Sequence, residues 1–317
     1  MMSGWHGYRT KSICGMLRRF RLHSKPPNIS RIVLGLYIHD AELAKLHHHE
    51  PLLRHSLSRL PQISSNELFA ASTANSWKTL MIRSHYQPPS PAHTNLCSST
   101  PEFASLGMLE SVSALASEEF TDVLQCHTLL TTWYTQYALV YKPASWLSLL
   151  ILWHSIFMSL HVDFNILELT LGRDGDEASQ KALPHAQKWI HSPDAKRCLL
   201  HAMLLQNHCE SLPMGAESAI HLPLSLYHCG IIWAAFMCFS EQNSDAIIVD
   251  AADYLQFEEL HLSGAGDLMN FGVLVPSRLA LGSVFRVVGL LQRIGHWKIS
   301  KSLASTLLGI VETREYL

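Results

Sequence analysis

Histidine is the residue type that most directly offers chemistry in this sequence. The chain holds 20 histidines among 317 residues, and imidazole is both a common metal ligand and an acid or base that titrates near neutral pH. Two histidines of one helix lie side by side when three or four residues separate them, and no pair has that spacing. A step of seven residues rises about 10.5 Å, too far for two imidazoles to share one zinc ion. The pairs with this longer spacing include His154/His161, His201/His208 and His221/His228.

The consecutive histidines at 47–49, followed by Glu50, are the other candidate for a metal site. Neighbouring residues of a helix point about 100° apart, so these side chains cannot converge on one ion without further ligands. A solvated polar face is therefore the favoured interpretation. His39-Asp40 resembles a dipeptide of metal-dependent phosphohydrolases, but the other ligands of such a site cannot be placed.

No catalytic motif stands out. H-E-x-x-H, G-x-S-x-G, the P-loop and G-x-G-x-x-G are all absent, and Asp250 and Asp253 form only a lone acidic pair. We therefore predict no catalytic, cofactor-binding or metal-binding residue and expect that the chain is not an enzyme. A helical metalloenzyme that gathers histidines from different helices is kept as an alternative.

The composition is that of a chain with a large interior. Hydrophobic residues make up 48% of the sequence and charged residues only 16%, with a formal net charge of −2. The seven cysteines are irregularly spaced and form no C-x-x-C pair. We expect buried thiols in a reducing compartment, because a disulfide framework would need closer spacing and a secretory start.

Charge is unevenly distributed along the chain. Residues 1–31 contain seven Lys or Arg and no acidic residue, so the rest of the chain has an excess of acid. An acidic body is a poor electrostatic match for DNA phosphates. We expect a disordered basic arm over 1–31, ended by Lys25-Pro26-Pro27, that is either a targeting signal or a solvated tail.

Helical periodicity runs through most of the remaining chain. Because no β-alternating segment of useful length occurs, the predicted fold is all-α, a multi-helix globular bundle with long loops. Ser64 or Ser65 is expected to cap a helix that buries Phe69 and Trp77. The predicted parts are the arm at 1–31, N-terminal helices at 32–84 that pack on the main domain, a Pro/Ser-rich linker at 85–101, and a main helical domain at 102–317. Within the main domain, helices are predicted over 103–141, from Pro143 onward, over 276–294 and over 299–311, with an acidic loop at 242–272.

Two long segments, 143–162 and 218–240, contain no Asp, Glu, Lys or Arg. Both reach the length of a membrane span, and a helical membrane protein is the first alternative to a soluble one. Each segment contains several Ser and His residues, and neither has an excess of Lys or Arg on one side. We therefore favour deeply buried core helices, and no membrane.

Polar residues between the central helices are interpreted as structural. Asp163, or else Asn165, is expected to cap a helix. Arg173 and Asp174 lie in a glycine-bounded turn, where they could tie two helices by an ion pair. Ser192 begins a helix on which Arg197 and His201 are i,i+4 neighbours. Internal bracing is favoured for these residues over contact with a regulatory ligand.

Two stretches of this centre resemble a known family. One has the order W-H-x5-L-x-x-D, L-E-L, G-R-D-G, and the other reads W-x-x-S-P-x-A-[RK]-R-x-x-L-H-A, with one residue of slack. Together they are similar to the regulatory, or middle homology, domain of fungal-specific transcription factors, over roughly 60–315. The residues that carry the resemblance are Trp153, His154, Asp163, Gly172, Arg173, Asp174, Gly175, Trp189, Arg197 and His201.

The resemblance implies a non-enzymatic, all-helical domain of a nuclear transcription regulator, with co-regulator proteins or a second copy as partners. In that family, DNA binding and zinc belong to a two-Cys two-His or binuclear zinc-cluster module. This sequence has no such cysteine and histidine pattern. We therefore assign no zinc or other cofactor to this chain and expect DNA contact only through a module that is not present here.

Overall fold

The computed structural model describes most of the chain outside its first 25 residues and several connections. The described residues are 26–53, 57, 60–61, 63, 66–83, 102–117, 122–138, 146–213, 219–240, 247–249, 259–260, 273–275, 277–294 and 298–315. They form an all-α structure, which confirms the predicted fold class. The β structure within these ranges is one antiparallel ribbon, β1 (Ile247–Val249) paired with β2 (Val273–Val275). Its three-residue strands are too short to show an alternating pattern.

The chain divides into two compact units, Met1–Thr121 and Asp122–Leu317. This division follows α5, whereas the sequence placed the start of the main domain at 102. The predicted linker at 85–101 and residues 1–25 of the predicted arm lie outside the described residues. The helices of the first unit are α2 (Pro26–Leu46), α3 (Asn66–Ala70), α4 (Ala74–Arg83) and α5 (Glu102–Ala116).

The first described helix begins at Pro26, so residues 26–31, which the sequence assigned to the disordered arm, are helical. Proline suits the first helical turn because the N–H it lacks would have no partner there. Four apolar residues of α2 are buried, and α2 packs on α5. Gly107 of α5 permits this approach, since a Cβ there would collide with the Leu34 side chain. The buried apolar residues of α2 are Leu34, Ile38, Ala41 and Ala44.

The α2–α5 contact also buries three charged side chains. Lys45 forms an ion pair with Glu42 one turn earlier on α2, and its Nζ lies 3.3 Å from Oε2 of Glu110 on α5. The side chain of Glu110 has no exposed surface. Burial, and then the neighbouring charge of Glu42, raise the pKa of Glu110 well above its ordinary value, although Lys45 opposes them.

The single helix predicted around Phe69 and Trp77 is in fact two, α3 and α4. Thr73 interrupts it with a capping box: its Oγ1 accepts the N–H of Ser76 at 3.1 Å, and its own N–H donates to Oγ of Ser76 at 3.2 Å. Phe69 was expected inside, yet it is 48% exposed, with the guanidinium of Arg31 4.2 Å from its ring centre. The predicted caps at 64 and 65 lie outside the described residues.

The second unit begins with α6, not with the continuous helix predicted over 103–141. Asp122 caps α6 by accepting the N–H of Gln125 at 3.1 Å, and the end of α6 passes into the π-helical turn η2. The helices of this unit are α6 (Val123–Trp133), η2 (Tyr134–Ala138), α7 (Trp146–His161), α8 (Phe164–Thr170), α9 (Asp176–Ile190), α10 (Pro193–Glu210), α11 (Leu222–Phe239), α14 (Ser277–Arg293) and α15 (Lys298–Glu315). Pro143 and most of the loop predicted at 242–272 lie outside the described residues.

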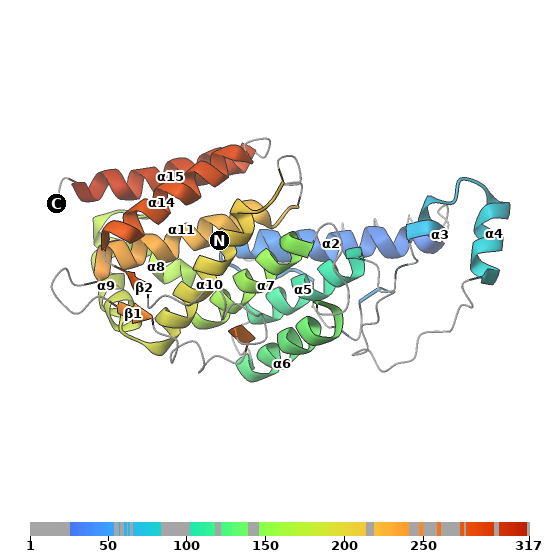
Figure 1. Cartoon of the computed structure of the whole chain (residues 1–317), viewed down its shortest axis with the longest axis horizontal. Helices are drawn as coiled ribbons and strands as arrows, with labels where there is room; N and C mark the ends of the chain where they lie inside the picture. The colour runs from blue at the N-terminus through green and yellow to red at the C-terminus, as the bar shows by residue number, and fades with distance from the viewer. Residues whose placement is uncertain are drawn as a thin grey trace, which may run out of the picture. The chain divides into compact units, whose positions relative to one another are not determined.

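Helix α11 is the central element of this unit. It lies between the α14–α15 pair on one side and α7 and α10 on the other (Figure 1). Gly230 lets the outer pair approach, because a Cβ at this position would lie 2.5 Å from Cδ1 of Leu307 and 3.2 Å from Cγ1 of Val287. The two helices predicted at the end of the chain therefore form one wall of the core.

Among the described helices, one is long and apolar enough by composition to cross a membrane. This is α11, and 89% of its 18-residue window is buried inside the unit. Residues 147–161 and 164–170 pass the same test only as a pair, and they are bent by 76° at the break between them. A helix that is apolar on all sides and covered by its neighbours fits the core of a folded unit.

Candidate functional site

Two histidines from different helices form a fully buried polar contact in the second unit. Nδ1 of His154 on α7 lies 2.8 Å from Nδ1 of His201 on α10, and neither residue has exposed surface. The ring of His201 stacks on Phe157 at 4.9 Å between centroids. Burial, followed by the proximity of His201 and His208, lowers the pKa of His154 well below its ordinary value. Both rings are therefore neutral, and one donates a hydrogen bond to the other.

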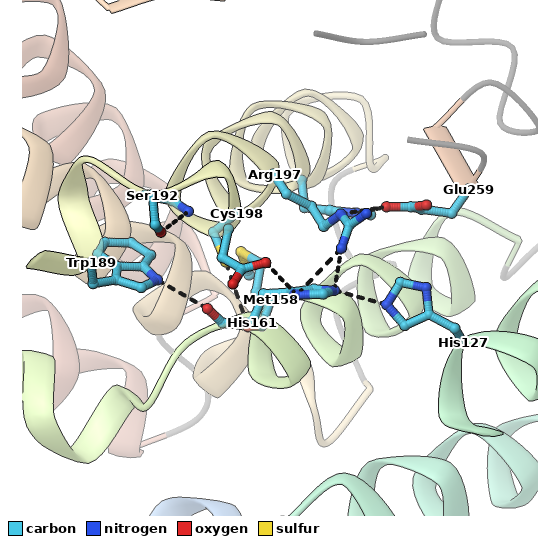
Figure 2. A network of polar contacts seen from close by, with 11 residues as sticks. His127, Met158, His161, Trp189, Ser192, Arg197, Cys198 and Glu259 are labelled. Carbon is cyan, nitrogen blue, oxygen red and sulfur yellow. Dashed lines mark hydrogen bonds and ion pairs between the residues drawn. The ribbon is translucent and has the colours of Figure 1, made fainter. Parts of the chain in front are cut away.

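A second histidine pair joins α6 to α7. Nε2 of His127 lies 2.8 Å from Nε2 of His161, the last residue of α7 (Figure 2). Nδ1 of His161 lies 2.9 Å from the Asp194 carboxylate, and Nη1 of Arg197 lies 3.0 Å from Nε2 of His161. The carboxylate accepts from Nδ1–H, so Nε2 carries the lone pair of the neutral ring and accepts from both other groups. Burial, then Arg197, lower the pKa of His161 to about 4.

Arg197 and Glu259 connect the two histidine pairs. Nε of Arg197 lies 3.1 Å from Oε1 of Glu259, and Nε2 of His201 lies 3.6 Å from the same oxygen. Figure 2 shows Arg197 between Glu259 and His161. Burial by itself raises the pKa of Glu259, but His201 and then Arg197 lower it to about 2. We call this set the histidine network; its members are His127, His154, His161, Asp194, Arg197, His201 and Glu259.

Local signals in the sequence begin and end the helices that hold the network. Ser192 caps α10 by accepting the N–H of Ala195 at 3.2 Å, with Pro193 in the first turn, as predicted. Asp163, not Asn165, caps α8 and accepts the N–H of Ile166 at 3.1 Å. The indole N–H of Trp189 donates to the carbonyl of His161 at 2.9 Å and fixes the end of α7.

Arg173 of the turn G-R-D-G bonds to residues of α8. The sequence had suggested that this turn ties two helices by an ion pair. Arg173 pairs with Glu168 at 3.0 Å, donates to Oδ1 of Asn165 at 2.7 Å, and contacts the adjacent Asp174 at 3.2 Å. Gly172 and Gly175 have φ of 97° and 88°, which only glycine adopts at little cost. Arg173 thus folds the turn back onto α8.

The structure brings together only part of the predicted signature. His154, Arg197 and His201 belong to the network, and Trp153 and Trp189 pack or bond beside it, whereas Asp163 and the 172–175 turn serve other junctions. Sequence reasoning missed four members, His127, His161, Asp194 and Glu259, as partners. Asp194 showed only as an acidic residue in a first helical turn, and neither His127 nor Glu259 has a local signal, because the contacts they make are long-range.

Two further arrangements have suitable residue types but lack the geometry for chemistry. Ser148 and His221 are buried partners, with Oγ and Nε2 3.2 Å apart, but Nε2 also lies 2.9 Å from the Ser148 carbonyl. That nitrogen must donate to the carbonyl, so it cannot take the hydroxyl proton as a general base would. Across the described ranges, no three His, Cys, Asp or Glu side chains meet in a way that could hold a metal ion. The histidines at 47–49 are exposed.

Fold and site together define an all-helical protein whose central helices are joined by a buried network of neutral imidazoles and one ion pair. Comparison of the chain with protein-family models, with curated proteins and with solved structures finds no match. The function of the chain must therefore be inferred from its own residues.

Proposed function

We propose that this chain is the regulatory domain of a fungal-specific transcription factor and acts in the nucleus through protein contacts, without a reaction of its own. Support comes from the similarity of the Trp153–Gly175 and Trp189–Ala202 stretches to that family's central motifs. In this proposal, zinc and DNA binding belong to a zinc module outside this sequence. The partners of this chain are co-regulator proteins or a second copy.

The observation that carries the proposal is how the signature residues are used. Asp163 caps a helix, Arg173 closes a turn, and His154 bonds His201 between two helices with no exposed surface on either ring. A catalytic group must reach its substrate, and the two histidines are closed to solvent. Asp163 and Arg173 are exposed, but both are engaged in bonds within the chain. Such use favours a scaffold that presents a surface to other proteins.

A reporter assay tests this function directly. The chain is fused to an unrelated DNA-binding domain in yeast, and the output of a reporter gene is compared with that of the DNA-binding domain alone. We expect a several-fold change in either direction, with the Lys181→Met fusion behaving like the wild type because Lys181 is an exposed residue. A folded, nuclear fusion that leaves the output unchanged would contradict the proposal.

Two simpler measurements test the nuclear location of the chain and its lack of DNA binding, which are the other parts of the proposal. A fluorescent fusion of the chain is expected in the nucleus, and a purely cytosolic or membrane signal would count against the assignment. In an electrophoretic-shift assay, the purified chain should show no tight, sequence-specific binding to duplex DNA. Specific binding at nanomolar concentration would mean that the chain reads DNA itself.

A further inference from the structure

The contact between α6 and α7 includes a hydrogen bond between two histidines that can hold only one proton. His127 and His161 are both half-buried, with their Nε2 atoms 2.8 Å apart. One nitrogen must donate and the other accept, because two N–H groups facing each other at this distance repel. His127 is the donor, since Nε2 of His161 also receives Arg197 at 3.0 Å.

This tautomer of His161 gives nearly all the polar groups around the ring a suitable hydrogen-bond partner. His127 reaches it from α6, while Asp194, Arg197 and His201 reach or influence it from α10. Glu259 holds Arg197 on the opposite side and is one of the charges that act on His127. A proton added at Nε2 of His161 would face an N–H of His127 and the Arg197 guanidinium at once. The charge of Asp194, which already accepts from Nδ1, favours protonation of His161, but burial and then Arg197 outweigh it and lower the pKa of His161.

We propose that the His127–His161 pair is a proton-sensitive latch, which holds α6 on α7 at neutral pH and releases α6 when the solution becomes mildly acidic. Release exposes both imidazoles to water, where each takes up a proton. The other contacts of α6 include the Trp153 indole, which donates to the Leu130 carbonyl at 3.0 Å, and the edge contact of His127 with Phe157 at 4.9 Å. The side chains of Cys126, Leu130 and Trp133 are also buried. The His154–His201 pair holds α7 to α10, so α6 can leave first.

The size of the effect is set by proton linkage. An exposed imidazole has a pKa of about 6.5, whereas burial and then Arg197 hold the pKa of His161 at about 4 in the closed state. Burial also lowers the pKa of His127. Between pH 7.5 and pH 5, the equilibrium for opening α6 should therefore increase by about 30-fold for each histidine that is neutral only when closed.

Hydrogen exchange of the full chain, corrected for the intrinsic pH dependence of exchange, tests the latch. Amides of α6 should open more readily at pH 5 than at pH 7.5, by about 30-fold for each such histidine, and with little dependence on low urea concentrations. His127→Gln keeps a donor toward His161 but cannot be charged, so it should remove about 30-fold of the pH effect. His185→Gln, an exposed histidine of α9, should leave the effect unchanged.

Two results would overturn the latch. One is an opening equilibrium of α6 that does not change with pH. An opening free energy of α6 equal to that of α11 at every pH would count in the same way, because α6 would then separate only when the unit unfolds. The other comes from nitrogen NMR of the unmodified protein at pH 7.5. His161 must carry its proton on Nδ1, and the opposite tautomer would remove the basis of the latch even if His127→Gln fails to fold.

Discussion

The two units of this chain bury ionisable groups in opposite ways. In the first unit, the Glu42–Lys45–Glu110 triad buries two carboxyl groups around one ammonium, and burial with a like charge raises the pKa of Glu110. In the second unit, the histidine network buries imidazoles that stay neutral because burial lowers the pKa of His154, His161 and His201. Desolvation opposes the charged form in both cases, and only the sign of that charge differs.

This difference predicts opposite responses of the two units to acid. A carboxyl group with a raised pKa stabilises the fold below its unfolded pKa, and this contribution is lost as the pH rises through the folded value. A histidine with a lowered pKa stabilises the fold above its unfolded pKa of about 6.5, and this contribution is lost as the pH falls toward the folded value. The units therefore respond to acid with opposite signs.

The largest expected effect is the acid response itself. Between pH 6.5 and pH 4, the second unit should lose roughly 3 kcal/mol of unfolding free energy for each of His161 and His208, whose pKa values burial lowers to about 4. The Glu110 contribution should stabilise the first unit over the same range. Hydrogen exchange of α11 and α5 measures the two units separately. Equal destabilisation of both helices would disprove the comparison.

A substitution inside the triad should have the next largest effect. Lys45→Met keeps the aliphatic stem but removes the ammonium that Glu42 and Glu110 share, which should cost about 3–5 kcal/mol in the first unit at pH 7. Lys181→Met is the matched control, because Lys181 pairs with Glu177 at 2.7 Å on an exposed face and should change stability by less than about 0.5 kcal/mol. Urea denaturation, followed through exchange of α2 amides, measures both; similar small losses would mean that the triad is not a buried charge site.

The buried carboxylate of the histidine network, Glu259, should matter less. Glu259→Gln removes the carboxylate beside Arg197, whose side chain is 19% exposed, so we expect a loss of about 2–3 kcal/mol at pH 7. The wild-type contribution is present above pH 4.5 and is lost toward pH 2, because the pKa of Glu259 is lowered to about 2. The loss of unfolding free energy caused by Glu259→Gln, measured by urea titration, should therefore be smaller at pH 3 than at pH 7. Glu312→Gln changes an exposed residue and is the control.

The smallest effects test whether the units unfold separately. Gly107→Ala in α5 and Gly230→Ala in α11 each place a methyl group against a leucine side chain, Leu34 and Leu307 respectively. Each should cost about 1–2 kcal/mol by overpacking, and only in its own unit. Gly289→Ala has open space around it and should be neutral or slightly stabilising. If either overpacked variant weakens both units equally in hydrogen exchange, they form one cooperative block.

Local signals account for the parts of the fold that the sequence predicted well. Ser192 and Pro193 start a helix because a cap needs only its own next three residues, and the same holds for Asp163. The predictions failed where one continuous helix was expected and a capping residue divides it into two. Thr73 and Asp122 stop or start helices by capping, but nothing in the apolar periodicity around them marks a break.

The amino-acid sequence by itself determined that this chain is helical, where its central helices begin, and that its interior is rich in histidine. Only the tertiary structure decided which histidines meet, since His127 and His161 are 34 residues apart and His154 and His201 are 47 apart. The physical reason is range: a cap or a turn is settled by neighbouring residues, whereas the protonation state of a buried imidazole depends on which distant groups the packing brings within about 3 Å of it.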